Sequence, residues 1–250
     1  MKISIVTVCY NSGAHLADAL RSVDSQTWHD REHVVVDGAS TDDTAAILAA
    51  HADPRRSVVS EPDAGIYDAM NKGLLRASGD VVGFLNADDM LADDEVIAEV
   101  ARSFIANPDV DLVYGDLNYV AADDLTRVVR RWRAGMFMPS KVRNGWMPPH
   151  PTFYARRSML ERVGQFDTRY RIAADYDFML RCLTQPGVRT HYLKMNMVRM
   201  RLGGISNQSI SSMLRKSGED LLIMRRLKVG GFWNLFAKNL RKLPQLFWHH

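Results

Sequence analysis

The sequence predicts an α/β protein with a doubly wound, mostly parallel sheet, followed by a helical C-terminal tail. Short apolar runs of strand length alternate with helical patterns through the first half of the chain. Such alternation is typical of parallel βαβ units. The loops that follow three of the predicted strands carry the polar residues Asn11, Asp37 and Asp88. Because ligands bind at the carboxyl edge of such sheets, we expect these three side chains to be neighbours there.

The elements follow from periodicity and turn residues. In the first half we expect strands at 3–8, 33–36, 57–60 and 81–85, and helices at 15–25, from 41 or 42 to 49, and at 66–76. The second half is less regular, with helices at 94–106, 158–163, 174–182 and 209–227, strands at 112–117 and 191–202, and a hairpin at 119–132. Residues 137–149 are rich in proline and glycine and are expected to be a long loop.

The charge of the chain is unevenly distributed. The 250 residues are 46% hydrophobic and 24% charged, with a formal net charge of +3. Six Lys and Arg and no Asp or Glu follow residue 220, which leaves the first 220 residues with a net charge of −3. An acidic body without a recognisable nucleic-acid module argues against nucleic-acid binding.

Cellular location is predicted from three negative features. Cys9 and Cys182 are too few and too distant in sequence for a disulfide framework or a zinc site, which indicates reduced thiols. Residues 3–8 are too short and too polar for the apolar part of a secretory signal. No apolar stretch reaches the roughly 18–20 residues that a membrane span needs. We therefore expect a cytoplasmic protein.

Oxygen ligands are concentrated directly after the strand at 81–85. Asn86, Asp88 and Asp89 follow it, and carboxylates placed so closely repel each other unless a cation joins them. Hard oxygen ligands suit Mg²⁺ or Mn²⁺. The alternative is a solvated loop in which Asp88 or Asp89 caps the helix beginning near residue 93.

Five segments, in order, resemble the family 2 glycosyltransferases, which have the GT-A fold. Residues 3–11 are similar to the opening strand and donor-binding turn of that family, 34–42 to its second segment, 65–73 to its Ala-x-Asn-x-Gly helix, 84–89 to its Asp-x-Asp metal motif, and 164–167 with 174–177 to its acceptor-site motifs. The resemblance covers about residues 3–205. It implies a GT-A-like catalytic domain at 1–205, with a nucleotide-binding first half, and basic, amphipathic helices at 206–250.

The resemblance also implies how a nucleoside-diphosphate-sugar donor binds. Asp37 is expected to accept a hydrogen bond from a uracil or guanine N–H, with Thr7, Tyr10 and Asn11 bordering the same pocket. Asp88 is the expected ligand of Mn²⁺ or Mg²⁺ bridging both phosphates. The remaining donor-binding positions it implies are Asp68, Lys72, Asn86 and Ala87.

Some of these roles have alternatives. Asp68 and Lys72 lie one turn apart on one helical face, so they can instead form an exposed ion pair worth roughly a few tenths of a kcal/mol. Asn86 stands where the family has Asp, and its neutral oxygen contacts either the metal or the donor. Asp89 is either a water-mediated ligand or a helix cap.

Asp175 corresponds by resemblance to the aspartate that takes the proton of the acceptor hydroxyl. Ala174 precedes it where the family usually has Glu, so Asp177 is the alternative base. The two side chains point apart on a helix, and Asp177 can pair with Arg181 four residues on. We assign the base to Asp175. For His150, in the acceptor-side loop, both a substrate contact and a purely structural role stay open.

The implied function is inverting, metal-dependent transfer of a hexose to a hydroxyl of a glycan or lipid-linked acceptor, in cell-surface polysaccharide or glycolipid synthesis. Four arginines, at 127, 130, 131 and 133, are either a solvated face or a contact for a phosphate-bearing acceptor. A nucleotidyltransferase is disfavoured because the turn at 9–13 has no basic residue. The alternative function is a non-catalytic nucleotide-sugar-binding protein on the same fold.

The tail has the composition of a helix that lies in a membrane interface. Apolar residues at 232, 236, 240, 243 and 247 share one helical face, and basic residues lie on the other. An anionic membrane surface is therefore an expected partner through 225–248, holding the protein on the inner face of the cell membrane. The alternative is that the same aromatic residues pack on the catalytic domain or on a second subunit of a homo-oligomer.

Overall fold

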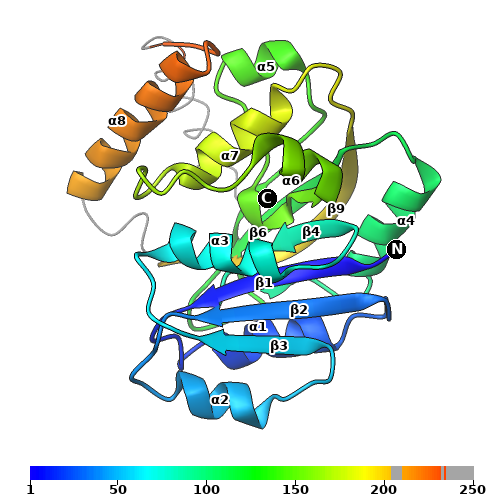
Figure 1. Ribbon diagram of the computed structural model, residues 1–250, viewed down its shortest axis with the longest axis vertical. Helices are drawn as coiled ribbons and strands as arrows, with labels where there is room; N and C mark the ends of the chain where they lie inside the picture. The colour runs from blue at the N-terminus through cyan, green and yellow to red at the C-terminus, as the bar shows by residue number, and fades with distance from the viewer. Residues whose placement is uncertain (204–209, 232–233, 235–250) are drawn as a thin grey trace.

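A computed structural model describes residues 1–203, 210–231 and 234. Its centre is a nine-stranded sheet in the order β3-β2-β1-β4-β8-β6-β9-β5, with β7 paired to β6. The first four strands, all mutually parallel, are β1 (Ile3–Cys9), β2 (Arg31–Asp37), β3 (Arg56–Ser60) and β4 (Val81–Phe84). They are joined by the helices α1 (Leu16–Asp24), α2 (Thr44–Ala50) and α3 (Ile66–Arg76), as the alternating pattern predicted (Figure 1).

The second half adds a mixed extension to this sheet. Its strands are β5 (Met90–Leu91), β6 (Leu112–Val120), β7 (Val128–Trp132), β8 (Tyr154–Arg156) and β9 (Thr190–Arg201). β6 runs parallel to β9, whereas β5, β7 and β8 are antiparallel to the strands beside them. The helices are α4 (Val96–Ala106), α5 (Pro139–Arg143), the short 3₁₀ turn η1 (His150–Thr152), α6 (Arg157–Val163), α7 (Ala174–Leu183) and α8 (Ile210–Arg226).

The predicted mostly parallel α/β sheet is confirmed, with three differences. The expected loop at 137–149 contains α5, because Pro139 at its first turn favours a helix start. β5 and β8 were not predicted, because two and three residues are too few to show a period. The hairpin is present as β6 and β7, and β6 extends further than expected, to Val120.

Each face of the sheet is covered by its own helices. Alternate residues of β1 enter different clusters: Val6 and Val8 pack with side chains of α3, α6, α7 and α8, whereas Ile3 and Ile5 pack with α1 and α4. α3 lies very close to β1 at Gly73, which has no side chain. A Cβ added there would lie only 2.4 Å from Cγ1 of Val6. This contact sets the position of the helix that carries part of the site.

Most of the predicted amphipathic tail, at 232–233 and 235–250, lies outside the described residues. The predicted helix at 209–227 is present as α8, which packs beside α7 (Figure 1). No helix in the described part of the chain combines the length and apolar character needed to cross a membrane. The division into domains at 1–205 and 206–250 stays a prediction.

Candidate active site

The loops after β1 and β2 meet through Ser40. The Ser40 hydroxyl donates a hydrogen bond to Oδ1 of Asp37 and accepts one from the N–H of Asn11 at 2.8 Å. Asp37 is buried, and its Oδ2 accepts a hydrogen bond from the hydroxyl of Ser60 at 2.6 Å. Asn11 and Asp37, distant in sequence, are thus neighbours at the carboxyl edge of the sheet. No described contact joins either of them to Asp88.

Two non-glycine residues in these loops have left-handed backbones. The φ angle of Asn11 is 48° and that of Ala39 is 59°. Asparagine tolerates this region, but for alanine it costs about 1–2 kcal/mol. The side-chain oxygen of Asn11 accepts the N–H of Thr41 at 2.9 Å, which holds the first loop against the second. Backbone strain of this kind concentrates at ligand-binding and catalytic sites.

The donor-binding candidates around these loops differ in exposure. The side chain of Tyr10 is 62% exposed, next to Gly38 at the end of β2. Thr7 is completely buried, and its hydroxyl lies 2.9 Å from Nε2 of His33 inside the sheet. Ala87 is buried in a cluster with Cys9, so only its main chain is available to a donor. The structure therefore leaves the Tyr10 ring exposed and keeps the side chains of Thr7 and Ala87 in the core.

The turn after β4 carries two carboxylates in different environments. Asp89 is buried, and its Oδ2 accepts a hydrogen bond from the Asn86 amide at 2.7 Å. Its Oδ1 is buried without a hydrogen-bond partner among the described residues. Asp88 beside it is half-buried. Burial and the Asp88 charge raise the pKa of Asp89 well above the usual range of a carboxyl group.

These groups fit a hard divalent cation. Asp88 and Asp89 are adjacent carboxylates, and one oxygen of Asp89 is buried without a hydrogen-bond partner among the described residues. A bound Mg²⁺ or Mn²⁺ would offset the repulsion between the two charges and supply a partner for that oxygen. Within residues 1–203, 210–231 and 234 no group of three or more His, Cys, Asp and Glu is placed to hold an ion. The alternative role as helix caps is wrong, because α4 begins at Val96 with Glu95 as its N-cap residue.

Lys72 is engaged by the loop that precedes α3. Its Nζ lies 3.2 Å from Oε1 of Glu61 and 3.6 Å from Oδ2 of Asp68, and it donates a hydrogen bond to the carbonyl of Pro62 at 2.7 Å. Asp68 also accepts the N–H of Ala64 at 3.0 Å. The ion pair that their spacing predicted is therefore present. A role of Asp68 and Lys72 in donor binding stays a prediction.

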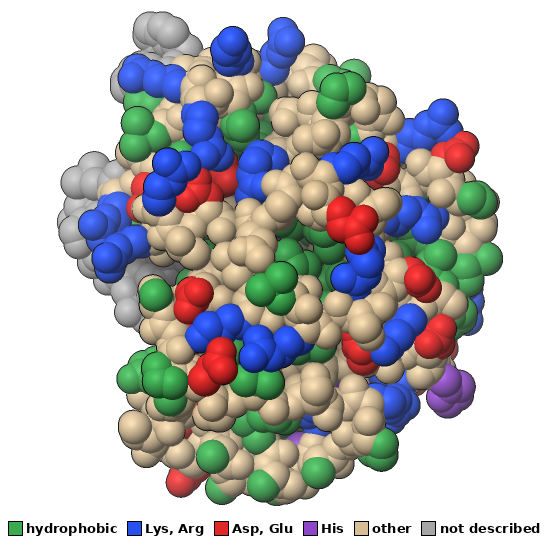
Figure 2. Space-filling model, viewed as in Figure 1, with side chains coloured by type: hydrophobic (Ala, Val, Ile, Leu, Met, Phe, Trp, Pro, Cys, Tyr) green, Lys and Arg blue, Asp and Glu red, His purple; other side chains and the backbone are tan. Residues whose placement is uncertain are grey.

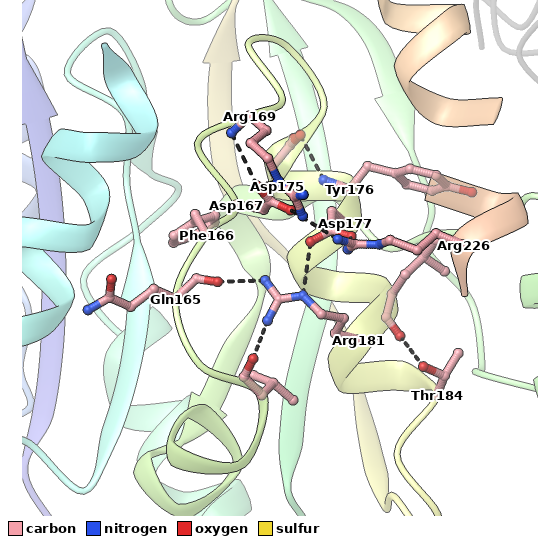
Figure 3. Close-up of polar contacts among 12 residues, drawn as sticks. Gln165, Phe166, Asp167, Arg169, Asp175, Tyr176, Asp177, Arg181, Thr184 and Arg226 are labelled. Carbon is pink, nitrogen blue, oxygen red and sulfur yellow. Dashed lines mark hydrogen bonds and ion pairs between the residues drawn. The ribbon is translucent and has the colours of Figure 1, made fainter. Parts of the chain in front are cut away.

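Asp175 and Asp177 have opposite surroundings in the first turn of α7 (Figure 3). Asp177 is fully buried and pairs with Arg226 and with Nε of Arg181, at 2.9 Å from the latter. Asp175 is half-buried; its Oδ1 accepts the N–H of Tyr176 at 2.8 Å, and its Oδ2 accepts no hydrogen bond from the described residues. The predicted Asp177–Arg181 pair is confirmed, which leaves Asp175 as the carboxylate with an available oxygen.

His150 lies in an aromatic cluster close to Asp175. Its ring centroid is 5.6 Å from that of Phe84 and 6.1 Å from that of Phe166. Nε2 is buried and has no hydrogen-bond partner in the described part of the chain. Burial lowers the pKa of His150, although the Asp175 charge acts in the opposite direction.

Comparison with known proteins identifies the family. Residues 4–166 match the model described as glycosyl transferase family 2. A PGL/p-HBAD biosynthesis glycosyltransferase of Mycobacterium bovis is 35% identical over 208 residues, covering 82% of this chain and 78% of the relative. The chain belongs to glycosyl transferase family 2. An uncharacterized glycosyltransferase of Mycobacterium tuberculosis is 31% identical over 181 residues, covering 72% and 68% of the two chains.

Solved structures share the fold of this glycosyltransferase at low identity. Residues 1–349 of S. aureus TarS, solved with UDP-GlcNAc, are 19% identical with a TM-score of 0.68, covering 92% of this chain and 66% of that one. This glycosyltransferase thus spans just under two thirds of that TarS fragment. The Pyrobaculum calidifontis mannosyltransferase PcManGT, solved with GDP-Man and Mn²⁺, is 19% identical with a TM-score of 0.68, covering 98% and 72%. The expected GT-A fold is confirmed.

Two residues of the glycosyltransferase site were not predicted. The hydroxyl of Tyr67 lies 3.2 Å from Oδ1 of Asp175 and 2.7 Å from the carbonyl oxygen of Ile172. Burial and the Asp175 charge raise the pKa of Tyr67, so the hydroxyl stays a donor. The Asn71 amide exchanges two hydrogen bonds with the main chain of Phe166, at 3.0 and 2.8 Å. Both residues lie on the buried face of α3, where polar groups need a partner, and that need was the available signal.

Proposed function

We propose that this glycosyltransferase moves a sugar, with inversion, from a nucleoside-diphosphate sugar to a hydroxyl of a glycan or lipid-linked acceptor. The observation that carries the proposal is the state of Asp175, whose Oδ1 is anchored and whose Oδ2 is available. A carboxylate within hydrogen-bond reach can take the acceptor proton as the new glycosidic bond forms. One in-line displacement at the anomeric carbon then inverts its configuration.

We assign the donor base to the carboxyl edge of β1 and β2. The exposed ring of Tyr10 offers a face on which a base can stack. Asp37 is buried with its oxygens already held by Ser40 and Ser60, so it is a rigid acceptor for a base N–H. Asn11 supports the same loops. Among the relatives, structures with UDP-GlcNAc and with GDP-Man support a nucleotide-sugar donor.

Asp88 is the proposed ligand of Mn²⁺ or Mg²⁺, with Asp89 and the Asn86 oxygen beside it. The ion would neutralise the diphosphate that leaves with the nucleoside. The Mn²⁺ in the structure of the Pyrobaculum calidifontis mannosyltransferase supports a divalent metal in this fold. The protein's own contribution is to hold the two carboxylates on a turn fixed by the end of β4.

The acceptor is proposed to belong to cell-surface polysaccharide or glycolipid synthesis. The PGL/p-HBAD biosynthesis relative supports a biosynthetic transfer of this kind. We also propose a cytoplasmic enzyme, held at the inner face of the membrane by residues 225–248. A non-catalytic nucleotide-sugar-binding protein is the second candidate function, and turnover distinguishes the two.

The decisive experiment measures nucleotide release from UDP-, GDP- and dTDP-sugars with and without Mn²⁺ or Mg²⁺. We expect turnover with one donor class, lost in chelator, and a fall of at least about a hundredfold for Asp88→Ala. Asp93→Ala, on the exposed loop before α4, is the control and should keep wild-type turnover. Donor binding without turnover would favour the binding protein, and full activity in chelator would remove the metal from the proposal.

A further inference from the structure

The first turn of α7, which carries Asp175, receives no hydrogen bond from the side chain of its N-cap residue. Its N-cap residue is Ala173, which has no side-chain acceptor for the free N–H groups of the first turn. The loop at 167–173 that leads into the helix contains one backbone hydrogen bond of its own, from the N–H of Tyr170 to the carbonyl of Asp167. Something else must hold this loop and the first turn.

Glu219 of α8 provides that contact. Its Oε1 accepts the N–H of Arg171 at 3.1 Å, and its Oε2 accepts the N–H groups of Ile172 and Ala173, each at 2.9 Å. Three successive amides therefore converge on one half-buried carboxylate. Hydrogen bonds to an ionised acceptor are stronger than neutral ones, and negative charge is favourable at a helix N-terminus.

Arg226 holds the other end of the same loop. It lies seven residues after Glu219, which places both on one face of α8. Its guanidinium pairs with Oδ2 of Asp167 at 2.9 Å and also with Asp177 (Figure 3). Between them, Ile223 is completely buried in the core shared with α7. α8 is thus anchored by packing and contacts the start and the end of the loop.

A short chain of contacts leads from Glu219 to the proposed base. Glu219 holds the N–H of Ile172, and the carbonyl of Ile172 lies 2.7 Å from the hydroxyl of Tyr67. That hydroxyl lies 3.2 Å from Oδ1 of Asp175. The loop, and through its Ile172 carbonyl the Tyr67 hydroxyl that contacts Asp175, are therefore linked to α8, which lies beyond the residues matched by the family model.

We propose that Glu219 is a positioning residue for Asp175, acting by holding the 171–173 amides and with them the first turn of α7. The proposal rests on the proposed function, because it gives Asp175 the role of base. Loss of the carboxylate leaves three amides without their acceptor, so the loop opens more often and Asp175 spends less time in the reactive geometry. A misplacement of about 1 Å is enough to cost up to about a hundredfold in rate.

The test uses three variants of the full chain. Glu219→Ala removes the acceptor, Glu219→Gln keeps one neutral acceptor oxygen, and Arg215→Gln, an exposed change on the same helix, is the control. In hydrogen–deuterium exchange we expect the 171–173 amides to exchange at least about tenfold faster in Glu219→Ala, an intermediate effect in Glu219→Gln, and none in Arg215→Gln. Thermal unfolding of each variant shows whether the whole fold has been weakened.

Steady-state kinetics test the consequence. We expect kcat to fall about ten- to hundredfold in Glu219→Ala while the KM for the donor stays within about twofold, with partial recovery in Glu219→Gln. Unchanged amide exchange, or faster exchange with unchanged kcat, overturns the positioning role. A fall in kcat that only parallels loss of folded protein overturns it too. A wild type inactive with every donor overturns the proposed function, whereas unchanged exchange in an active enzyme overturns the positioning role alone.

Discussion

Asp175 and Asp177 are separated by one residue on α7, and their partners decide their chemistry. Asp177 forms ion pairs with the guanidinium groups of Arg181 and Arg226, and each of its two oxygens contacts one of them. Asp175 faces Tyr67 and keeps one oxygen available. Loss of a buried, paired carboxylate leaves the charges of its partners uncompensated, whereas a half-exposed carboxylate can exchange a proton with a substrate.

Substitution with asparagine should separate these roles. Asp175→Asn should lower transfer at least about a hundredfold with donor affinity nearly unchanged, because the amide cannot take a proton. Asp177→Asn should lower the free energy of unfolding by about 3 kcal/mol, because it breaks a buried ion pair. The checks are single-turnover transfer, nucleotide titration and urea unfolding. The reverse pattern would move the base to Asp177, and a product with retained anomeric configuration would contradict single displacement.

The buried residue His33 leads to a prediction of how the free energy of unfolding depends on pH. Its Nε2 lies 2.9 Å from the Thr7 hydroxyl, and its Nδ1 accepts the Nε–H of Arg56 at 3.2 Å. Burial, together with the Arg56 charge, lowers the pKa of His33 from 6.5 to about 3. Below about pH 6.5 the unfolded chain therefore binds a proton that the folded protein does not. The contribution of His33 to stability is complete above that pH and declines by about 1.4 kcal/mol per unit towards pH 3.

The measurement is the free energy of unfolding in urea between pH 7.5 and 4.5, compared with His33→Gln. Glutamine can still hydrogen-bond Thr7 but never ionises in this range. We expect the wild type to lose stability with falling pH more steeply than the variant, by about 1.4 kcal/mol per unit once the pH is well below 6.5. Equal slopes for the two proteins would show that His33 is protonated in the folded state.

At the scale of elements, the local sequence was sufficient to predict a helix or strand where the hydrophobic period and the turn residues agreed. α3 was predicted with its observed bounds, because Gly65 precedes it and apolar residues recur on one face. β8 could not be predicted, because its three residues form a strand only between β4 and β6. Among the candidate site residues, Asp37 and Asp88 were proposed from their positions after predicted strands, and Asp175 from the family resemblance; their roles stay predictions. The contacts of Tyr67 and Glu219 depend on how α3 and α8 pack against the loop before α7, and no local sequence pattern encodes that packing.

The approach of α3 to β1 gives a prediction about an element. Ala has the higher helix propensity, by about 1 kcal/mol, but a Cβ at position 73 would lie 2.4 Å from Val6. We expect Gly73→Ala to destabilise the fold by about 1–3 kcal/mol, because overpacking outweighs propensity. Gly218→Ala in α8, where nothing lies within 4 Å of the new Cβ, should instead stabilise it by up to about 1 kcal/mol.

Thermal and urea unfolding of the two variants provide the measurement. We expect changes of opposite sign in the free energy of unfolding, although both substitutions add the same methyl group inside a helix. The difference comes from Val6, which crowds position 73, whereas position 218 is open. A stabilised Gly73→Ala protein would mean that α3 can move away from β1. Activity should then be measured as well, because α3 also carries Tyr67 and Asn71, which contact the loops around Asp175.

At the scale of the whole molecule, cations and exposed apolar groups share one end. Figure 2 shows Lys and Arg side chains along the top of this face, over α5, with few Asp or Glu among them. The segment between β7 and α5 also exposes Met136 (71%) and Met138 (49%). Asn234 donates a hydrogen bond to the carbonyl of Arg143 at 2.5 Å, so the start of the tail lies against α5. Asn234 and this segment therefore lie at one basic, partly apolar end.

That arrangement makes the membrane prediction specific. We expect the intact protein to sediment with anionic vesicles at low salt and to be released at high salt, because each cation near an anionic surface contributes about 1 kcal/mol. Deleting 230–250 should abolish most of the binding, and the double change Met136→Ser with Met138→Ser should weaken it. The matched control, Leu75→Ser with Ile105→Ser, alters equally exposed residues on α3 and α4 and should have no effect.

The competing role of the tail predicts a different set of results. If its aromatic face packs on a second copy of the chain, the intact protein is a dimer in solution, ignores vesicles at every salt concentration, and aggregates once 230–250 are removed, because the deletion exposes the apolar surface that the tail covered. If the tail instead binds the membrane, the truncated protein stays soluble and keeps its turnover with a water-soluble acceptor. Only transfer to an acceptor embedded in vesicles should then fall, because the enzyme no longer concentrates where that acceptor lies.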